Sequence, residues 1–461
     1  MAKNEHKFGL ALSGGGYRAA TYHIGTFRAL RKMDLLDKID VISTNSGGSI
    51  AGACYSLHHA DFEKFENLLV KGVQKSVIGR LIKTPRFFIP VLIMLGIIFF
   101  AIALFFTSYA WLNIFIGPAF IIAFLYGQYE ILPISRIIEK IYDDIFYQKA
   151  TLGELSDKFE TVINSTNLDT GRIFHFSQDL MQDTTYAKNL KKQRAKLNKK
   201  LKETKDEKEI EKLKAALKKI PTEISFDPTG FPVSRAVMAS SSVPFAFTPV
   251  KIAQKYFTSP ESFQLFKPRL VDGGVYDNQG IHKITHPQSS YYCKNVIVSD
   301  AGTKLPFEDN YRNMFTLLVR TSSVFMARIK NLQKMSSVHS IPQAADSIVA
   351  YQSLGDDLDE TINNFIEGLQ FGYIPAEVIA AHNIPEKYFI DKNWTAIKEL
   401  IIENLAFSHL LEQGCTAKEL ETARSVSTNL TPLKDAETKA LIKHAEAITE
   451  IQVKLYLPHI L

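Results

Sequence analysis

Cysteine is scarce in this sequence, and charged residues are distributed unevenly along the chain. The 461 residues include three cysteines, Cys54, Cys293 and Cys415. An odd number at such wide spacing excludes a disulfide framework and a cysteine-based metal site, and it is typical of a reducing compartment. Charged residues make up 22% of the chain and aromatic residues 11%, which excludes wholesale disorder and collagen-like repeats. The length is sufficient for about three domains, or for one large α/β domain with insertions.

The longest gap in charge lies between Phe87 and Tyr129, where the sequence has no charged residue. One helix of that length would be about twice as long as the hydrocarbon core of a bilayer is thick. We therefore predict two membrane-spanning helices, near residues 87–106 and 110–126, joined by a turn at 107–109. The second segment is also compatible with a re-entrant or interfacial helix, and the whole run with a pair of buried core helices.

The start of the chain lacks a secretory signal, because it leads directly into a short apolar run at 8–12 that predicts a strand. Four basic residues, Lys75, Arg80, Lys83 and Arg86, precede the uncharged run, and basic residues beside a span mark its cytoplasmic side. Two crossings return the chain to the side it left, so residues before and after the run can share one site. The sequence thus predicts a multi-pass membrane protein with two spans and the bulk of the chain on the cytoplasmic side.

Aromatic residues are absent from the most basic stretch of the chain. Residues 188–219 contain 14 Lys and Arg against 5 Asp and Glu, a local charge of +9 that leaves −3 for the rest of a chain with net charge +6. Nucleic-acid binders interleave basic residues with aromatics on a folded face, so we expect no nucleic-acid partner. The apolar spacing over 187–220 predicts one helix or a helical hairpin. It is either a solvated amphipathic segment or a patch for anionic lipid, where each basic residue contributes about 1 kcal/mol.

A glycine loop is the first motif that the sequence does contain. Gly14, Gly15 and Gly16 separate the predicted first strand from a stretch at 17–33 whose apolar periodicity predicts a helix. Backbone N–H groups of such a loop can bind a phosphate or stabilise an oxyanion. A tight turn without further function is the alternative. The loop lacks the acidic residue of a dinucleotide site and the Lys-Ser/Thr pair of a P-loop.

A serine turn follows a second predicted strand at 39–44. Ser46 would stand at the start of a helix, where the helix dipole favours a developing anion, as in the GxSxG elbow of serine hydrolases. Thr44 replaces the first glycine of that pattern, and a β-branched residue crowds the turn. Ser46 would also suit a simple helix N-cap. Ser49 is a competing nucleophile, but the elbow needs a glycine two positions on, and only Ser46 has one, Gly48.

The third motif is Asp272, Gly273 and Gly274, at the end of another predicted strand. An aspartate there can reach a serine at a neighbouring strand end and act as its base. An Asx-type turn is the alternative. None of the 12 histidines follows Asp272 in the manner of a triad histidine, and His23 and His58 lie on helical faces as packing or surface residues.

The three motifs occur in the order of the patatin-like phospholipase family, which the chain resembles. Two further blocks, at 167–172 and 239–244, resemble the intervening segments of that family. The resemblance spans roughly residues 7–302, interrupted by the uncharged and the basic insertions. Agreement of several blocks in one order is more specific than any single block.

The resemblance implies a three-layer α/β/α fold, here with an inserted transmembrane helical hairpin and a helical C-terminal region. It also implies a serine hydrolase with a Ser-Asp dyad: Ser46 would attack a lipid ester carbonyl, and Asp272 would accept its proton. The oxyanion hole would consist of the backbone N–H groups of Gly14, Gly15 and Gly16. Arg18 would belong to the same site, where it would support the loop or meet a lipid phosphate. No metal or cofactor is implied.

The expected division of the chain places a catalytic domain around two insertions. Its parts are the catalytic segments 1–86, 130–186 and 221–305, the transmembrane hairpin 87–129, the basic helical insertion 187–220 and the mainly helical C-terminal region 306–461. The last of these carries no motif that we detect.

The function expected from these features is that of a membrane-anchored lipid acyl hydrolase that cleaves fatty-acyl esters of glycerophospholipids. Its partners would be membrane phospholipid and the bilayer. A lipid acyltransferase would use the same acyl-enzyme with an alcohol in place of water. A non-catalytic membrane scaffold or lipid-binding protein is the remaining alternative, if Thr44 disables the elbow.

Overall fold

The computed structural model describes residues 6–220, 224–303, 305, 313–338 and 347–461. Within these residues nine strands form one sheet in the order β5-β4-β3-β2-β1-β8-β9, with β6 and β7 off this path. The strands are β1 (His6–Leu12), β2 (Val41–Asn45), β3 (Glu160–Asn167), β4 (Arg172–Phe176), β5 (Met181–Gln182), β6 (Val250–Lys251), β7 (Arg269–Asp272), β8 (Cys293–Asp300) and β9 (Ile348–Ser353). The five strands from β3 to β9 along this order pair in parallel and the others antiparallel. The predicted α/β class is confirmed, with a mixed and mostly parallel sheet.

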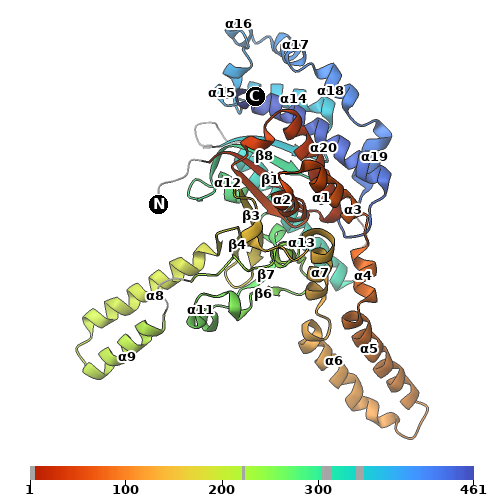
Figure 1. Cartoon of the computed structure of the whole chain (residues 1–461), viewed down its shortest axis with the longest axis vertical. Coiled ribbons are helices and arrows are strands. Elements are labelled where there is room, and N and C mark those ends of the chain that lie inside the picture. The colour runs from red at the N-terminus through yellow and green to blue at the C-terminus, as the bar shows by residue number, and fades with distance from the viewer. Residues whose placement is uncertain (1–5, 221–223, 304, 306–312, 339–346) are drawn as a thin grey trace.

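Helices surround the sheet, and two helical pairs project away from it (Figure 1). In the described residues the α-helices are α1 (Gly16–Lys32), α2 (Gly47–His58), α3 (Phe62–Val73), α4 (Val77–Lys83), α5 (Pro85–Leu104), α6 (Asn113–Ile131), α7 (Ile134–Tyr142), α8 (Thr184–Glu203), α9 (Glu207–Lys219), α10 (Val233–Ser240), α11 (Pro260–Leu265), α12 (His282–Thr285), α13 (Met314–Val338), α14 (Leu358–Gln370), α15 (Ala376–Ala381), α16 (Glu386–Ile390), α17 (Trp394–Asn404), α18 (Phe407–Gln413), α19 (Ala417–Ser425) and α20 (Asp435–Tyr456).

Both faces of the sheet carry apolar core, because successive side chains of a strand point to opposite faces. Leu10 and Leu12 of β1 belong to the larger cluster, together with buried residues of α1, α2 and α20. Ala11 belongs to the smaller cluster on the other face, with Ile281 and Ile284 at α12. The central strands are thus covered on both sides, as parallel strands require.

The uncharged run forms α5 and α6, which project from the body as one arm (Figure 1). Their apolar side chains are exposed: Phe99 is 74% exposed and Tyr126 is 89% exposed. Both helices are long and apolar enough to cross a membrane. Two long apolar helices are therefore present, with bounds a few residues from those predicted, and the alternative of buried core helices is wrong.

The basic stretch forms a helical hairpin, α8 and α9, which projects as a second arm (Figure 1, yellow-green). Asp206 caps α9 by accepting a hydrogen bond from the Lys208 N–H. Arg194 ties the two helices together by donating to the carbonyl of Ile220 at 2.6 Å. Most side chains of the arm are exposed, so this part of the chain is solvated along nearly all of its length.

The C-terminal region contributes a strand and a helix to the body. Strand β9 pairs in parallel with β8 and extends the sheet, although the sequence pattern beyond Asp309 indicated mostly helix. A short run of six buried residues has no alternation that distinguishes a strand from a helix. Helix α20 crosses α1 so closely that a Cβ on Gly25 would lie 2.1 Å from the carbonyl oxygen of Ile442.

Candidate active site

A strained turn joins β2 to α2 and carries Ser46. Its backbone has φ 47° and ψ −116°, outside the regions that L-residues favour. Three hydrogen bonds hold it there: its N–H donates to the Ser240 hydroxyl at 2.9 Å, and its carbonyl accepts from the N–H groups of Ser49 at 2.9 Å and Ile50 at 3.3 Å. Such strain costs roughly 1–3 kcal/mol and is concentrated at active sites.

Thr44 fits this turn because the facing helix has a glycine. Its side chain is fully buried, and its Cγ2 lies 2.5 Å from the position that a Cβ on Gly52 would take. Its hydroxyl shares a hydrogen bond of 2.9 Å with Ser49 and donates to the carbonyl of Val162 at 3.3 Å. The crowding expected from a β-branched residue is therefore absorbed by the missing side chain at position 52.

Ser49 is held as a structural residue. It is fully buried, and its hydroxyl bonds to those of Thr44 at 2.9 Å and Ser240 at 2.8 Å. Ser46 instead keeps 6% exposure. Of the two serines, Ser46 is the one with access to the surface of the sheet edge.

Strand pairing brings Asp272 to Ser46. Strand β3 pairs with β2 up to Asn164, opposite Asn45. From Ser165 onward the same side of β3 pairs with β7, and Ser165 lies opposite Asp272, since β4 occupies the other side. The C-terminal ends of β2 and β7 are therefore adjacent along the same side of β3. Ser46, which follows β2, lies next to Asp272, the last residue of β7.

Asp272 is a buried carboxylate with few partners. Burial raises its pKa to about 6, against the opposing effect of hydrogen bonds from the Gly274 N–H and the Ser46 side chain. The Gly274 N–H donates to its Oδ1 at 2.7 Å. At neutral pH the carboxylate is mostly ionised, yet it binds a proton far more readily than an exposed aspartate. A buried carboxylate near a serine is an arrangement that is able to accept the serine's proton.

The glycine loop lies against the serine turn. A Cβ on Gly14 would lie 3.1 Å from the Cβ of Ser46, and one on Gly47 would lie 2.2 Å from the carbonyl oxygen of Gly16. The Gly14 N–H donates to the Asn278 carbonyl at 2.8 Å. Among the described residues the N–H groups of Gly15, Gly16 and Gly47 have no hydrogen-bond partner, so they are free to donate beside the serine turn.

Arg18 is buried next to the glycine loop and contacts the C-terminal region. Its side chain is 9% exposed, its Nη1 donates to the carbonyl of Val426 at 3.2 Å, and burial lowers its pKa. A Cβ on Gly15 would lie 3.7 Å from its Nη2. Of the two roles expected for Arg18, the buried position suits support of the loop rather than contact with a lipid phosphate.

The C-terminal region holds the same loop from a second side, which the sequence did not reveal. The Tyr17 N–H donates to the carbonyl of Asn429 at 2.9 Å, and a Cβ on Gly16 would lie 2.3 Å from that oxygen. These contacts are made by backbone atoms, so no residue pattern in the last third of the chain indicates them.

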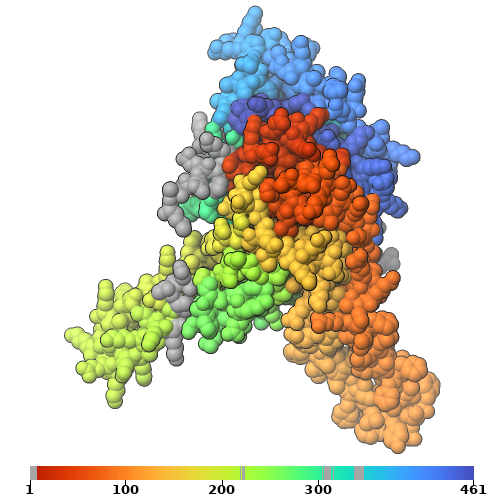
Figure 2. Space-filling model, in the orientation of Figure 1, coloured from red at the N-terminus to blue at the C-terminus, as the bar shows by residue number. Residues whose placement is uncertain are grey.

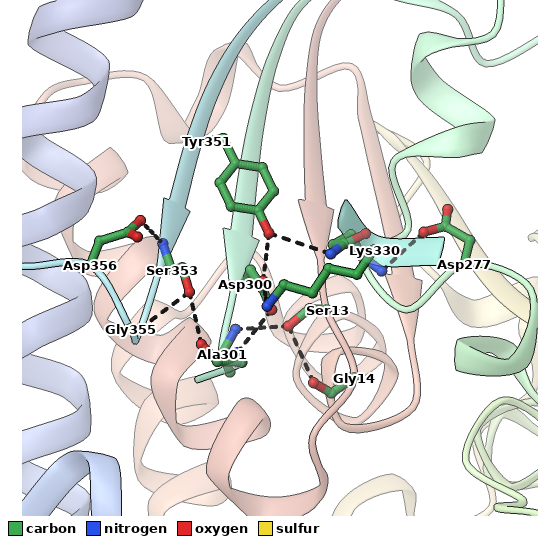
Figure 3. Close-up of polar contacts among 12 residues, drawn as sticks. Ser13, Gly14, Asp277, Asp300, Ala301, Lys330, Tyr351, Ser353, Gly355 and Asp356 are labelled. Carbon is green, nitrogen blue, oxygen red and sulfur yellow. Dashed lines mark hydrogen bonds and ion pairs between the residues drawn. The ribbon is translucent and has the colours of Figure 1, made fainter. Parts of the chain in front are cut away.

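A polar network behind the loop fixes the ends of β1, β8 and β9 (Figure 3). Burial alone would raise the pKa of Asp300, but Lys330 at 2.6 Å, the Tyr351 hydroxyl at 2.5 Å and the Gly302 N–H outweigh it and lower that pKa. The Ser13 hydroxyl accepts from the Ala301 N–H at 2.8 Å. This network anchors the strand ends from which the glycine loop starts.

His23 confirms the expectation of a packing residue. Its ring nitrogens bond to the Ser299 hydroxyl at 2.8 Å and to the Ser13 carbonyl at 2.9 Å, and burial lowers its pKa to about 4. The ring is therefore neutral at physiological pH. Within the described residues no group of three or more His, Cys, Asp or Glu side chains is placed to hold a metal ion.

A serine on a strained strand-to-helix turn above an α/β sheet is the arrangement found in serine hydrolases. The family model for patatin-like phospholipase matches residues 10–283, more than half of the chain. The chain therefore belongs to the patatin-like phospholipase family, whose members are serine lipid hydrolases.

Comparison with solved structures finds VipD from Legionella pneumophila at 13% identity. The match covers 99% of this chain and 86% of that one, with a TM-score of 0.32, which is too low to carry an argument. The comparison with curated proteins gives no match.

Proposed function

We propose that the chain is a membrane-anchored lipid acyl hydrolase that cleaves fatty-acyl esters of glycerophospholipids. The observation that carries this proposal is the strained Ser46 at the end of β2, which strand pairing brings beside the end of β7 and its buried Asp272. Membership of the patatin-like phospholipase family supports the lipid substrate.

The reaction begins when Asp272 accepts the hydroxyl proton of Ser46 and Oγ attacks the ester carbonyl. The N–H groups of Gly15, Gly16 and Gly47 are the donors available to the tetrahedral oxyanion, and removing one such donor costs about 3–4 kcal/mol. Protonated Asp272 then gives its proton to the departing lipid alcohol, which leaves an acyl-serine. Water, deprotonated by Asp272, attacks the acyl group, and the proton returns to Ser46 as the fatty acid leaves.

Anchoring by α5 and α6 follows from their exposed apolar surface. A helix of 20 residues such as α5 is about 30 Å long, which equals the hydrocarbon thickness of a bilayer. We propose that the two helices cross the membrane once each, and that the basic residues before α5 keep the catalytic domain on the cytoplasmic side. An anchored domain holds its site at high effective concentration near lipid.

The scaffold alternative depended on a turn disabled by Thr44. Because Gly52 makes room for the Thr44 methyl group, that premise has no support in the geometry.

The proposal is tested by incubating the purified chain with phospholipid vesicles and measuring released fatty acid by mass spectrometry. We expect Ser46→Ala to lower the rate by at least about 10³-fold and Ser49→Ala to retain turnover, with both variants folded by circular dichroism. Equal turnover by Ser46→Ala and the wild type would overturn the proposal. Transfer of the acyl group to a lipid alcohol, without release of fatty acid, would instead identify an acyltransferase.

A further inference from the structure

Helix α13 exposes an apolar stripe to the surface, which is unusual for an amphipathic helix. Its exposed positions recur every three or four residues, the spacing of one helical face. The apolar stripe consists mainly of Met314, Leu317, Val324, Phe325, Leu332 and Met335. Met314 is 79%, Phe325 63% and Met335 61% exposed. A helix on a water-facing surface normally presents its polar side outward.

The inner face of α13 is held by polar contacts. Lys330 forms the ion pair with buried Asp300 at 2.6 Å, and the Lys334 ammonium lies 4.6 Å from the centroid of the Tyr351 ring. Figure 3 shows Lys330 reaching across the strand ends toward Asp300. Because these groups bind the helix to the sheet, the apolar stripe is fixed in its outward direction.

The same helix borders the candidate active site. A Cβ on Gly274, two residues after Asp272, would lie 3.1 Å from the Cε of Met326. In Figure 1 α13 lies at the end of the body from which the arm of α5 and α6 projects. A surface that received the apolar stripe would therefore be brought to the edge of the sheet that carries Ser46.

The charge of α13 identifies the kind of surface. Residues 313–338 contain four basic residues, Arg320, Arg328, Lys330 and Lys334, and no acidic one. Lys330 is already paired with Asp300 and Lys334 lies over Tyr351, whereas Arg328 is exposed alongside the apolar stripe. Apolar side chains beside basic ones are the pattern of a helix that lies in the interface of an anionic bilayer.

We propose that α13 is a docking helix for anionic phospholipid, which inserts its apolar stripe into the leaflet and presents the Ser46 edge of the sheet to the membrane. This inference deepens the proposed function by naming the surface on which the same site works. A second copy of the chain would bring basic residues against basic residues, so lipid is the better partner.

The test places an environment-sensitive fluorophore on the stripe of the full chain. Cys54 and Cys293 are buried, so a Cys415→Ser background leaves new cysteines as the reactive ones. Phe325→Cys and Leu332→Cys carry the probe, and Ile390→Cys on α16, which is 72% exposed, is the matched control. The chain is reconstituted in nanodiscs of phosphatidylcholine with or without phosphatidylglycerol, and spin-labelled lipid serves as quencher.

We expect the probes on α13 to shift to shorter wavelength and to lose intensity to the lipid quencher in discs that contain phosphatidylglycerol, while the probe at position 390 does neither. Probes on α13 that are no more quenched than the control would overturn the proposal. A wavelength shift that depends on chain concentration and is insensitive to the quencher would assign the stripe to a second copy and overturn it as well.

An activity measurement separates this inference from the proposed function. Phe325→Ser combined with Leu332→Ser is expected to lower hydrolysis of phosphatidylglycerol vesicles by about tenfold, with hydrolysis of a soluble short-chain ester unchanged. The fluorescence result needs no turnover and must be the same with Ser46→Ala. Docking without any hydrolysis by the wild type would therefore contradict the proposed function alone, and hydrolysis without docking would contradict only the role of α13.

Discussion

At Thr44 a β-branched side chain occupies a position where the serine elbow has glycine. The structure accommodates it because Gly52, one turn into the facing helix, has no side chain. The side chain of Thr44 in β2 fills the space that a side chain at Gly52 in α2 would otherwise occupy. Interior packing is too dense for either to change alone.

The pair predicts a compensating double substitution. Gly52→Ala places a methyl group 2.5 Å from the Thr44 Cγ2, so we expect it to lower the free energy of unfolding by about 1–3 kcal/mol. Adding Thr44→Ser removes that Cγ2 and keeps the hydroxyl that bonds to Ser49, so the double variant should recover most of the loss in a urea titration. A double variant no more stable than Gly52→Ala would contradict this account.

Asp272 makes a second prediction at the residue scale, because a buried base opposes folding. Burial raises its pKa from 3.8 to about 6, so the folded chain holds this proton more tightly than the unfolded chain. The contribution to stability is complete below pH 3.8 and declines by up to about 3 kcal/mol as pH rises through 6. We expect Asp272→Asn to raise Tm at about pH 8, to change it little at about pH 4, and to abolish turnover. A lower Tm at the higher pH would contradict the burial argument.

At the scale of elements, local sequence patterns predicted the motifs and the strands and helices beside them. They did not predict that Asp272 lies next to Ser46. The glycine loop and the serine turn are short signals between strand and helix, so their structure follows from nearby residues. Asp272 lies near Ser46 because β2 and β7 pair with consecutive parts of the same side of β3. This register is set by residues more than a hundred positions apart in the sequence. The resemblance to a family supplied the pairing that periodicity does not contain.

The contact between the glycine loop and the C-terminal region gives a prediction for Arg18. Arg18→Met removes the hydrogen bond to the Val426 carbonyl and leaves a similar volume, so the loop N–H groups lose orientation while the lipid pocket is unchanged. We expect kcat on a soluble ester to fall by about tenfold with KM nearly constant, since a net hydrogen bond from a charged group contributes about 1.5–3 kcal/mol. Exposed Arg136→Met serves as the control. A change confined to KM would indicate that Arg18 binds substrate instead.

At the scale of the whole molecule, two arms project from the body: the apolar arm of α5 and α6 and the basic arm of α8 and α9 (Figures 1 and 2). A third feature, the apolar stripe of α13, lies on the body itself. The two arms were predictable from the sequence because one is a long apolar run and the other a long basic run. The stripe was not, because its apolar spacing is that of an ordinary helix, and only the packing shows which face is left outside.

The apolar arm predicts a change of cellular fraction. Leu95→Arg combined with Ile122→Arg places a charge near the middle of each helix, at about 2.5–3.5 kcal/mol per residue for membrane insertion. We expect the wild type to stay with membranes after alkaline carbonate extraction and the double variant to be released, with its reactivity at Ser46 retained. Release of the wild type by carbonate would contradict the two proposed spans.

The central claim is that Ser46 is a nucleophile activated by Asp272. Its most direct test is labelling of the detergent-solubilised chain with a fluorophosphonate probe as a function of pH, for the wild type, Ser46→Ala and Ser49→Ala. We predict that labelling of the wild type and of Ser49→Ala rises through about pH 6, where Asp272 loses its proton, and that Ser46→Ala is not labelled at any pH. Labelling that survives Ser46→Ala, or that shows no change across the range, would contradict the account.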